Sequence, residues 1–285
     1  MSKLTRYVFV SDVHGRFDKL TKALAGVNFN KDTDTLVVLG DSFDRGDQSL
    51  EVLKYIMSCP NRILIWGNHD FRLRELVLGK AVDTCDYSNG VLETMQSFCP
   101  DHKKVQSIDM LIHIMQSNSA YEDTYRLLWR YFSECVWAAE WADLIATHGW
   151  LPHERIAVYE RGSEPEMKAF LNPNWRSASR DAWYDASWAH TEMCCHYECY
   201  PDKPLIVGHW HAWRLHLLFN NMPYHTAPFT TCIGAGGKLI AIDGCSNAAE
   251  GVVNTWIKTD NREPVLYDGR MQKFFFFYEQ FSGQS

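Results

Sequence analysis

VVLGDSFDRGD, residues 37–47, places three carboxylates directly behind an apolar run, with Arg45 as the one basic residue among them. The three are Asp41, Asp44 and Asp47. Clustered carboxylates repel one another unless a positive charge lies between them. The apolar run at 36–39 predicts a buried strand, and open α/β sheets place their sites at the carboxyl ends of such strands. The stretch therefore predicts a site that needs additional positive charge.

Apolar runs and amphipathic segments alternate around this stretch. The runs at 7–10, 36–39 and 63–66 are each followed closely by Gly or Asp. Between them, RFDKLTKALAGV and DQSLEVLKYIMS carry apolar residues at helical spacing. This βαβαβ pattern predicts an α/β fold with a largely parallel, buried sheet.

The rest of the chain is less regular. Helical spacing continues over about 71–140, which predicts a mainly helical cap or insertion within a single domain spanning 1–285. Residues 151–202 show no regular pattern, whereas the tail segments KLIAIDG, VVNTWIK and PVLYD predict strands that could be antiparallel. The final run KFFFFYEQF is expected in the core, with a subunit contact as the alternative.

Composition narrows the class of protein. A chain of 285 residues with 46% hydrophobic content can bury a full core. Its net charge of −7 argues against a nucleic acid partner, which needs a basic face. The apolar run at 7–10 is too short for a signal peptide, and no run approaches the length of a membrane span. We expect a cytoplasmic protein without a membrane partner. The oligomeric state is left open.

The nine cysteines fit reduced thiols better than a disulfide framework. One group, MCCHYECYP, brings Cys194, Cys195 and Cys199 close to His190 and His196, which is chemically able to hold zinc. The paired C-x-x-C spacing of zinc sites is missing, so we expect these cysteines to be unligated.

Five apolar runs end in residues of metal-ligand type. The motifs are SDVHG (Asp12, His14), GDSFDRG (Asp41, Asp44), GNHD (Asn68, His69), THG (His148) and GHWH (His209, His211). Each alone is compatible with a turn, a helix cap or an interior histidine. Together they predict a metal centre, because a cation removes the conflict between gathered carboxylates and imidazoles.

The motif set D-x-H, G-D-x-x-D-R-G, G-N-H-D, a lone His and G-H-x-H resembles the calcineurin-like metallophosphoesterases. GDSFDRG is similar to the branch that contains Ser/Thr protein phosphatases and bacterial diadenosine tetraphosphatases. The resemblance spans about residues 7–245. It implies a hydrolase with a four-layer α-β-β-α sandwich and a two-metal site between the sheets.

By motif position, the resemblance also implies the ligands. The first metal would take Asp12, His14 and His211, the second Asn68, His148 and His209, and Asp41 would bridge both. Nitrogen and oxygen donors suit Mn²⁺, with Fe or Zn²⁺ as alternatives. Two such divalent ions about 3.5 Å apart activate a bridging hydroxide for in-line attack on phosphorus.

The same resemblance assigns roles beside the metals. His69 would be the general acid, oriented by Asp44. Arg45 would bind the substrate phosphate together with Asn68, although a surface ion pair of Arg45 with a neighbouring carboxylate is the alternative. Asp47 is expected to cap the helix that follows.

The substrate is less constrained than the chemistry. GNHD and GHWH depart from the G-N-H-E and G-H-T of protein phosphatases, and a second phosphate-binding arginine could be Arg176 or Arg180. The leading hypothesis is a phosphomonoesterase of Ser/Thr protein phosphatase type, acting on a phosphorylated protein. The alternative is hydrolysis of a dinucleoside polyphosphate such as diadenosine tetraphosphate, or of another nucleotide, and a noncatalytic scaffold is the third hypothesis. Tryptophans could stack bases or simply pack in the core: Trp150, Trp175, Trp183 and Trp188.

Overall fold

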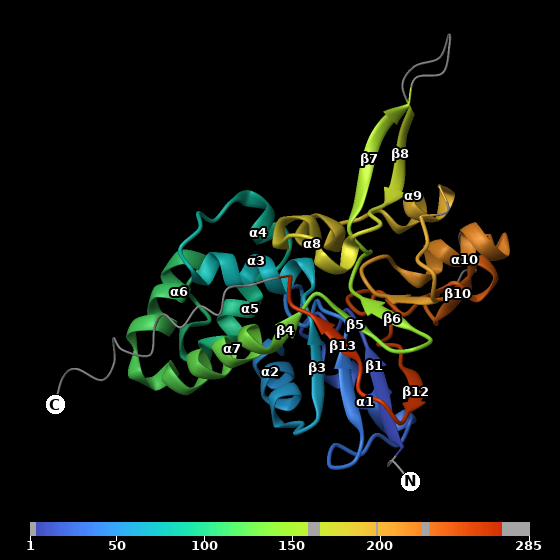
Figure 1. Cartoon of the computed structure of the whole chain (residues 1–285). Coiled ribbons are helices and arrows are strands. Elements are labelled where there is room, and N and C mark those ends of the chain that lie inside the picture. Colours follow the sequence, from blue (N-terminus) through green and yellow to red (C-terminus); the bar gives the residue numbers. More distant parts are fainter. Residues whose placement is uncertain (1–3, 159–165, 198, 224–227, 270–285) are drawn as a thin grey trace.

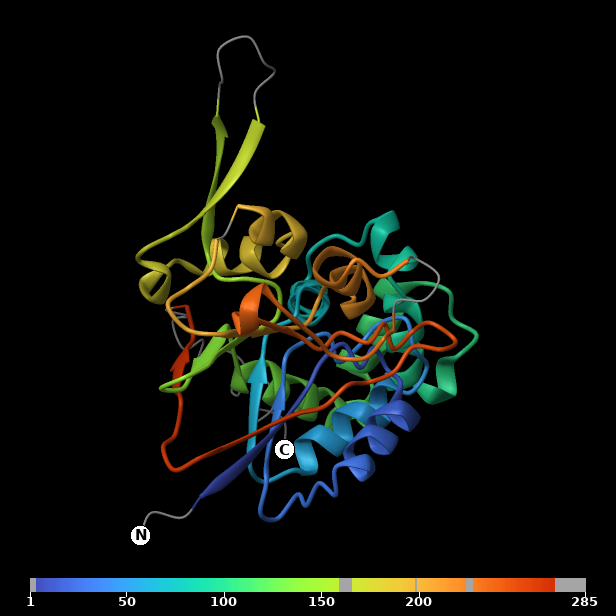
Figure 2. The same ribbon diagram turned by 90° about the vertical axis from the view of Figure 1, so that its right-hand side faces the viewer.

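Two β-sheets packed face to face form the centre of the structure (Figures 1 and 2). The computed structural model describes residues 4–158, 166–197, 199–223 and 228–269. One sheet has the strand order β12-β1-β2-β3-β4, and the other has the order β10-β11-β9-β6-β5-β13. Helices lie on the outer faces, which gives the four-layer α-β-β-α arrangement. The final run KFFFFYEQF lies outside the described residues.

The first sheet begins with the predicted βαβαβ unit. Strands β1 (Thr5–Val10), β2 (Thr35–Val38) and β3 (Arg62–Ile65) are parallel neighbours. Helices α1 (Phe17–Gly26) and α2 (Ser49–Ser58) connect them, so this prediction is confirmed. The prediction that Asp47 caps the following helix is wrong. The residue directly before α2 is Gln48, and the Asp47 side chain is 84% exposed.

Side chains alternate between two layers along these strands. Tyr7 and Phe9 of β1 face the second sheet, where they pack edge-on against Trp141. Val8 and Val10 belong to the cluster on the helical side. One face of these strands is covered by helices and the other by the second sheet. For this reason each strand is a continuous apolar run in the sequence.

The chain between β3 and β4 is helical. Its elements are α3 (Asn68–Val77), α4 (Thr84–Ser88), α5 (Val91–Phe98), η1 (Pro100–His102), α6 (Ile108–Ser117), η2 (Ser119–Tyr121) and α7 (Glu122–Glu134). The helical insertion was predicted to extend to about residue 140, but its last helix, α7, ends at Glu134. Strands β4 (Cys135–Val136) and β5 (Ala138–Glu140) follow at once and pair with β3 and β6. Alanine favours helix, but pairing in two sheets outweighs that preference.

The second half of the chain builds the second sheet and an arm. The remaining strands of this sheet are β6 (Ile145–Thr147), β9 (Leu205–Val207), β10 (Cys232–Gly234), β11 (Leu239–Ala241) and β13 (Val265–Tyr267). Helices here are η3 (Trp175–Ser177), α8 (Arg180–Ser187), α9 (Thr191–His196), α10 (Ala212–Asn220) and η4 (Ala235–Gly237). The predicted tail strands divide between the sheets: β11 is parallel to β9, whereas β12 (Trp256–Asp260) is antiparallel to β1.

Strands β7 (His153–Val158) and β8 (Glu166–Leu171) form an antiparallel arm that extends away from both sheets (Figures 1 and 2). The sequence pattern did not predict it. Ile156 and Phe170 are each 47% exposed, so the arm lacks the buried apolar face that makes a strand recognisable.

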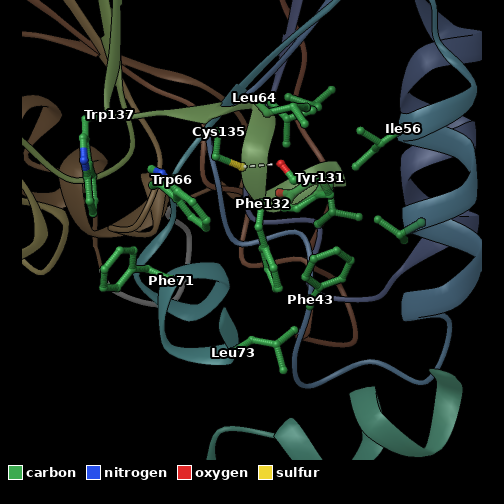
Figure 3. Packing of buried hydrophobic residues seen from close by; sticks show 14 of the residues in the cluster. Phe43, Ile56, Leu64, Trp66, Phe71, Leu73, Tyr131, Phe132, Cys135 and Trp137 are labelled. Carbon is green, nitrogen blue, oxygen red and sulfur yellow. Dashed lines mark hydrogen bonds between the residues drawn. The ribbon is translucent and has the colours of Figure 1, made fainter. Parts of the chain in front are cut away.

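The helical block packs its aromatic side chains against the strand that carries the opening stretch. Phe43 contacts Phe98 of α5 and Tyr131 of α7, with ring centroids 5.6 Å and 5.1 Å away. Trp66, just beyond β3, stacks on Phe132 of α7 (Figure 3). The block therefore shares one core with the sheet and positions the turn after β2.

We predict that Phe98→Ala lowers the free energy of unfolding by about 3–5 kcal/mol, because it leaves a cavity in this shared core. Urea denaturation followed by fluorescence and circular dichroism would show one coincident transition at a lower midpoint. Phe170→Ala, on the exposed arm, is the control and should change the midpoint little. Two separate transitions in the Phe98 variant would contradict the single-domain prediction.

Candidate metal centre and active site

Ligand-type side chains from both sheets meet at the carboxyl ends of their strands. Five strands supply them: β1, β2, β3, β6 and β9. Two groups have all their ligand atoms within 4.8 Å of one another, and Asp41 belongs to both. The groups are Asp12, His14 and Asp41, and Asp41, His148 and His209. Asn68 adjoins the second group through His148.

Each carboxylate at the site is anchored by one oxygen and presents the other. Asp41 Oδ1 accepts a hydrogen bond from the His69 backbone N–H at 3.0 Å. Its Oδ2 lies 3.4 Å from His148 Nε2 and 3.8 Å from His14 Nε2. Asp12 Oδ2 accepts from the Ser11 hydroxyl and from the His209 N–H. Separations of about 3–4 Å are those expected between ligands of one ion with bonds near 2.1 Å.

The imidazole tautomers are fixed by backbone carbonyls. Nδ1–H of His14 donates to the Phe43 carbonyl at 2.9 Å, and Nδ1–H of His148 donates to the Leu39 carbonyl at 2.6 Å. Only an N–H can make these bonds, so Nε2 of each ring is the atom directed at the carboxylates. This is the usual arrangement of metal-binding histidines.

The cluster needs more positive charge than the protein supplies. His148 Nε2 lies 2.8 Å from Asn68 Oδ1, and two acceptors at this distance require a proton or a cation between them. Burial lowers the pKa of His148, but the Asp41 charge outweighs it and raises the pKa to about 10. Burial and the nearby Asp243 charge raise the pKa of Asp12 to about 8. Nitrogen and oxygen donors in these surroundings fit divalent metal ions.

Arg45 faces this cluster and not the surface. Its guanidinium donates to His14 Nε2 at 2.6 Å, and its other terminal nitrogen lies 3.1 Å from His69 Nε2. Burial and the Arg45 charge hold the pKa of His14 well below its usual range. Within the described residues, Arg45 forms none of the ion pairs with Asp44 or Asp47 that were the sequence alternative.

His69 and Asp44 form a buried hydrogen-bonded pair. His69 Nδ1 donates to Asp44 Oδ2 at 2.8 Å. Burial lowers the pKa of His69, but Asp41 and the bond to Asp44 raise it overall. The helical block supplies a partner that sequence reasoning missed: the Thr94 hydroxyl donates to Asp44 Oδ1 at 3.2 Å and accepts from the Asp44 N–H at 2.8 Å. No sequence motif marks Thr94, because it lies fifty residues away on α5.

His211 belongs to neither ligand group, although it lines the same cavity as Asp12 and Asp41. Its Nδ1 bonds Asp243 Oδ2 at 2.9 Å, and its Nε2 lies 3.5 Å from Cys245 Sγ. Burial lowers the pKa of His211, but the bond to Asp243 raises it to about 10. Asp243 is a buried residue that the sequence interpretation missed. The sequence does contain a signal for Asp243. The apolar run in KLIAIDG is followed by Asp243, just as the other apolar runs are followed by ligand-type residues.

The two candidates for a second phosphate-binding arginine lie elsewhere. Arg176 donates to Glu140 at 2.7 Å and 2.9 Å and lies over the Trp175 ring. Arg180 pairs with Asp181 and lines a separate hollow. The cavity at the ligand cluster, about 220 Å³, is lined instead by Arg45 and Arg214.

The remaining residues singled out in the sequence divide by burial. Trp150, Trp175 and Trp183 are buried in the core, which confirms the packing alternative for them. Trp188 is 39% exposed, and its ring centroid lies 6.4 Å from that of His69. The cysteines of MCCHYECYP are buried, and the metal-ligand groups found among the described residues do not include them.

The backbone at the site is strained. Among the described non-glycine residues, left-handed φ angles gather at the cluster: Asp12 (50°), His14 (48°), Asp41 (51°), Asp44 (69°), Arg45 (66°) and His209 (60°). Such conformations cost roughly 1–3 kcal/mol each and are typical of functional sites. Two glycines allow the close packing, because a Cβ at Gly67 would lie 2.1 Å from Asp41 Oδ1 and one at Gly208 would lie 2.3 Å from Asp12 Oδ2.

Residues 5–214 match the family of calcineurin-like phosphoesterases. This chain belongs to that family. As a calcineurin-like phosphoesterase it is a metallophosphoesterase and therefore a hydrolase, and members of the family generally bind divalent metals.

Relatives of this phosphoesterase include symmetrical bis(5'-nucleosyl)-tetraphosphatases. That of Hamiltonella defensa is 46% identical over 71 residues, which is 25% of this chain and 26% of the relative. That of Salmonella typhimurium is 45% identical over 71 residues, 25% of each chain. The matches thus span about a quarter of these relatives.

Solved structures with a similar fold include two phosphatases. The cold-active protein-tyrosine phosphatase of a psychrophilic Shewanella species has 16% identity and a TM-score of 0.46, covering 94% of this chain and 79% of that one. A protein serine/threonine phosphatase from Saccharomyces cerevisiae has 13% identity and a TM-score of 0.43, covering 91% and 82%. Likenesses at this level carry no functional information. None of the helices in the described parts of the chain has the length and apolar character to cross a bilayer.

We predict that Gly67→Ala weakens Mn²⁺ binding roughly 10–100-fold, because the added methyl group displaces the Asp41 carboxylate. Isothermal titration calorimetry measures this directly. Gly26→Ala is the matched control, since a Cβ at Gly26 would have no atom within 4 Å. Equal affinities in the two variants would show that Asp41 does not hold the metal.

A second prediction concerns the Arg176–Glu140 pair. The hydrogen bond from Arg176 lowers the pKa of Glu140 to about 2. Ionised Glu140 therefore stabilises the fold above its unfolded pKa of about 4.3, and this contribution is lost as the pH falls toward 2. Glu140→Gln should be destabilised near pH 6, and its difference from the wild type should shrink on acidification. Glu122→Gln, an exposed pair with Arg126, is the control. A difference that grows on acidification would contradict the pairing.

Proposed function

We propose that this calcineurin-like phosphoesterase hydrolyses phosphate esters at a two-metal centre that shares Asp41. The observation that carries the proposal is the membership of Asp41 in both ligand groups. One ion would be held by Asp12, His14 and Asp41 and the other by Asp41, Asn68, His148 and His209. His211 would complete the first set through Nε2, with its ring oriented by Asp243. When bound, the ions would supply Lewis-acid charge and an activated water for attack on phosphorus.

His69 would protonate the leaving-group oxygen. Its Nδ1–H is held by Asp44, so Nε2, which lies beside Arg45, is the atom that would carry the transferable proton. The raised pKa of His69 favours the protonated imidazole near neutral pH. Thr94 holds the second Asp44 oxygen and thereby fixes the plane of the carboxylate. Asp44 and Thr94 are positioning residues, since they act through His69.

Arg45 would bind the oxygens of the phosphoryl group. Its two terminal nitrogens lie at hydrogen-bond distance from His14 and from the proposed acid His69. A planar guanidinium can exchange these imidazole contacts for hydrogen bonds to phosphate oxygens, which carry greater negative charge. The Asn68 amide, whose Nδ2 is buried without a partner among the described residues, could donate to the same group.

Two substrate classes remain candidates. A phosphomonoester, as on a phosphorylated protein, is supported by the similarity of GDSFDRG to protein phosphatases. A dinucleoside polyphosphate is supported by the names of the relatives and by the exposed Trp188 beside His69, which offers an aromatic face to a base. We propose Mn²⁺ as the native ion and the cytoplasm as the compartment.

Turnover on a matched substrate panel tests the proposed function. The kcat/KM values for a phosphoserine peptide, diadenosine tetraphosphate and bis-p-nitrophenyl phosphate would be compared with Mn²⁺ added. Hydrolysis of at least one, abolished by chelation and restored by Mn²⁺, is the expected result. Failure on all three in protein that has bound two ions would overturn the proposal.

His69→Asn should retain bound metal but lose roughly 10²–10⁴-fold in kcat on substrates with poor leaving groups, because proton donation is lost. Activated aryl phosphates need less protonation and should be affected much less. Steady-state kinetics on phosphoserine and p-nitrophenyl phosphate would separate the two cases. Equal losses on both substrates would argue against a general-acid role for His69.

A further inference from the structure

The cavity at the ligand cluster has a cation that the proposed mechanism does not use. Arg214 lines it together with Asp12, Asp41 and Arg45. Arg45 comes from the turn after β2, whereas Arg214 comes from the first turn of α10, which begins directly after His211. Two guanidinium groups therefore reach one cavity from different elements of the fold.

Among the described residues, the guanidinium of Arg214 contacts two aromatic rings and no carboxylate. Its guanidinium carbon lies 5.2 Å from the centroid of Trp210 and 5.1 Å from that of Trp213. Trp210 is itself fixed, because its Nε1–H donates to the Ala189 carbonyl at 2.9 Å. Cation–π contacts orient a guanidinium without using its N–H donors.

The donors of Arg214 remain available to a ligand. Within the part of the chain that the structure describes, its guanidinium has no hydrogen bond and no carboxylate within 4.0 Å. Arg176 and Arg180 differ in this respect, because their guanidinium donors are paired with the carboxylates of Glu140 and Asp181. A charged, planar fork that is exposed to a cavity and lacks an acidic partner is suited to a phosphate oxygen pair.

We propose that Arg214, held between Trp210 and Trp213, binds a second phosphate of the substrate, next to the one that is cleaved. The proposal rests on the proposed function, because it assigns Arg45 and the metals to the scissile phosphate. It makes Arg214 a specificity-determining residue. Substrates with at least two linked phosphates, such as nucleoside polyphosphates, gain this contact and simple monoesters do not.

Two ligands that cannot be hydrolysed separate the subsite from the chemistry. Inorganic phosphate carries one phosphoryl group, and methylenediphosphonate carries two joined through carbon. Their dissociation constants would be measured by calorimetry at a fixed free Mn²⁺ concentration, for wild type, Arg214→Ala, Arg214→Lys and Arg180→Ala. Circular dichroism and thermal midpoints would verify folding, which truncation of an exposed side chain should leave intact.

The wild type should prefer the diphosphonate, and Arg214→Ala should reduce this preference roughly 10–100-fold, the value of one or two charge-assisted hydrogen bonds. Arg214→Lys should be intermediate, because it keeps the charge and loses the planar fork. Arg180→Ala should keep the wild-type ratio. Parallel losses for both ligands would mean that Arg214 holds the scissile phosphate, and unchanged dissociation constants for both would mean that it binds neither; each result overturns the proposal.

The same experiment distinguishes this subsite from the proposed function. If the wild type hydrolyses none of the panel substrates, the proposed function fails, while the ratio of the two dissociation constants still decides the role of Arg214. If turnover is present and the wild type shows no preference for the diphosphonate, the proposed function survives and the second-phosphate subsite is wrong.

Discussion

The carboxylate of Asp41 is the constraint on which the rest of the site depends. It is buried, one oxygen is held by the His69 N–H, and the other meets imidazoles from β1 and β6. A buried carboxylate in such surroundings is stable only with compensating positive charge. The imidazoles supply part of it, and two divalent ions would supply the remainder. Five strand ends, from both sheets, place ligand-type side chains around this single group.

Backbone strain and packing hold that arrangement in place. Asp12, His14 and Asp41 adopt left-handed conformations that an isolated chain would avoid. The helical block offsets this cost, since Phe98 and Tyr131 enclose Phe43 in the same turn that presents Asp41 and Asp44. The block is thus part of the site's scaffold. Its Thr94 reaches the proposed acid pair itself, which links a segment without a recognisable motif to the chemistry.

Sequence patterns predicted the features that depend on neighbouring residues in the chain, namely the buried strands and the polar residues at their ends. The apolar runs that end in ligand-type residues correctly predicted strands β1, β2 and β3. They also correctly predicted that Asp41 and His148 lie close together. Contacts between distant segments left no such mark: Thr94 meets Asp44 across fifty residues, and Asp243 meets His211 across thirty-two. Strand β5 was missed because alanine-rich sequence favours helix until a partner strand pairs with it. The sequence suggested Arg176 or Arg180 as a second phosphate-binding arginine, whereas the arginine that lines the cavity beside Arg45 is Arg214, to which no sequence motif pointed.

Anomalous diffraction from crystals grown with Mn²⁺ would show directly whether two ions share the Asp41 carboxylate. We expect two peaks, one on each side of the Asp41 carboxylate, with Asp12 and His14 at the first and Asn68 and His148 at the second. A single peak, or two peaks of which only one contacts Asp41, would contradict a shared carboxylate and with it the proposed two-metal chemistry.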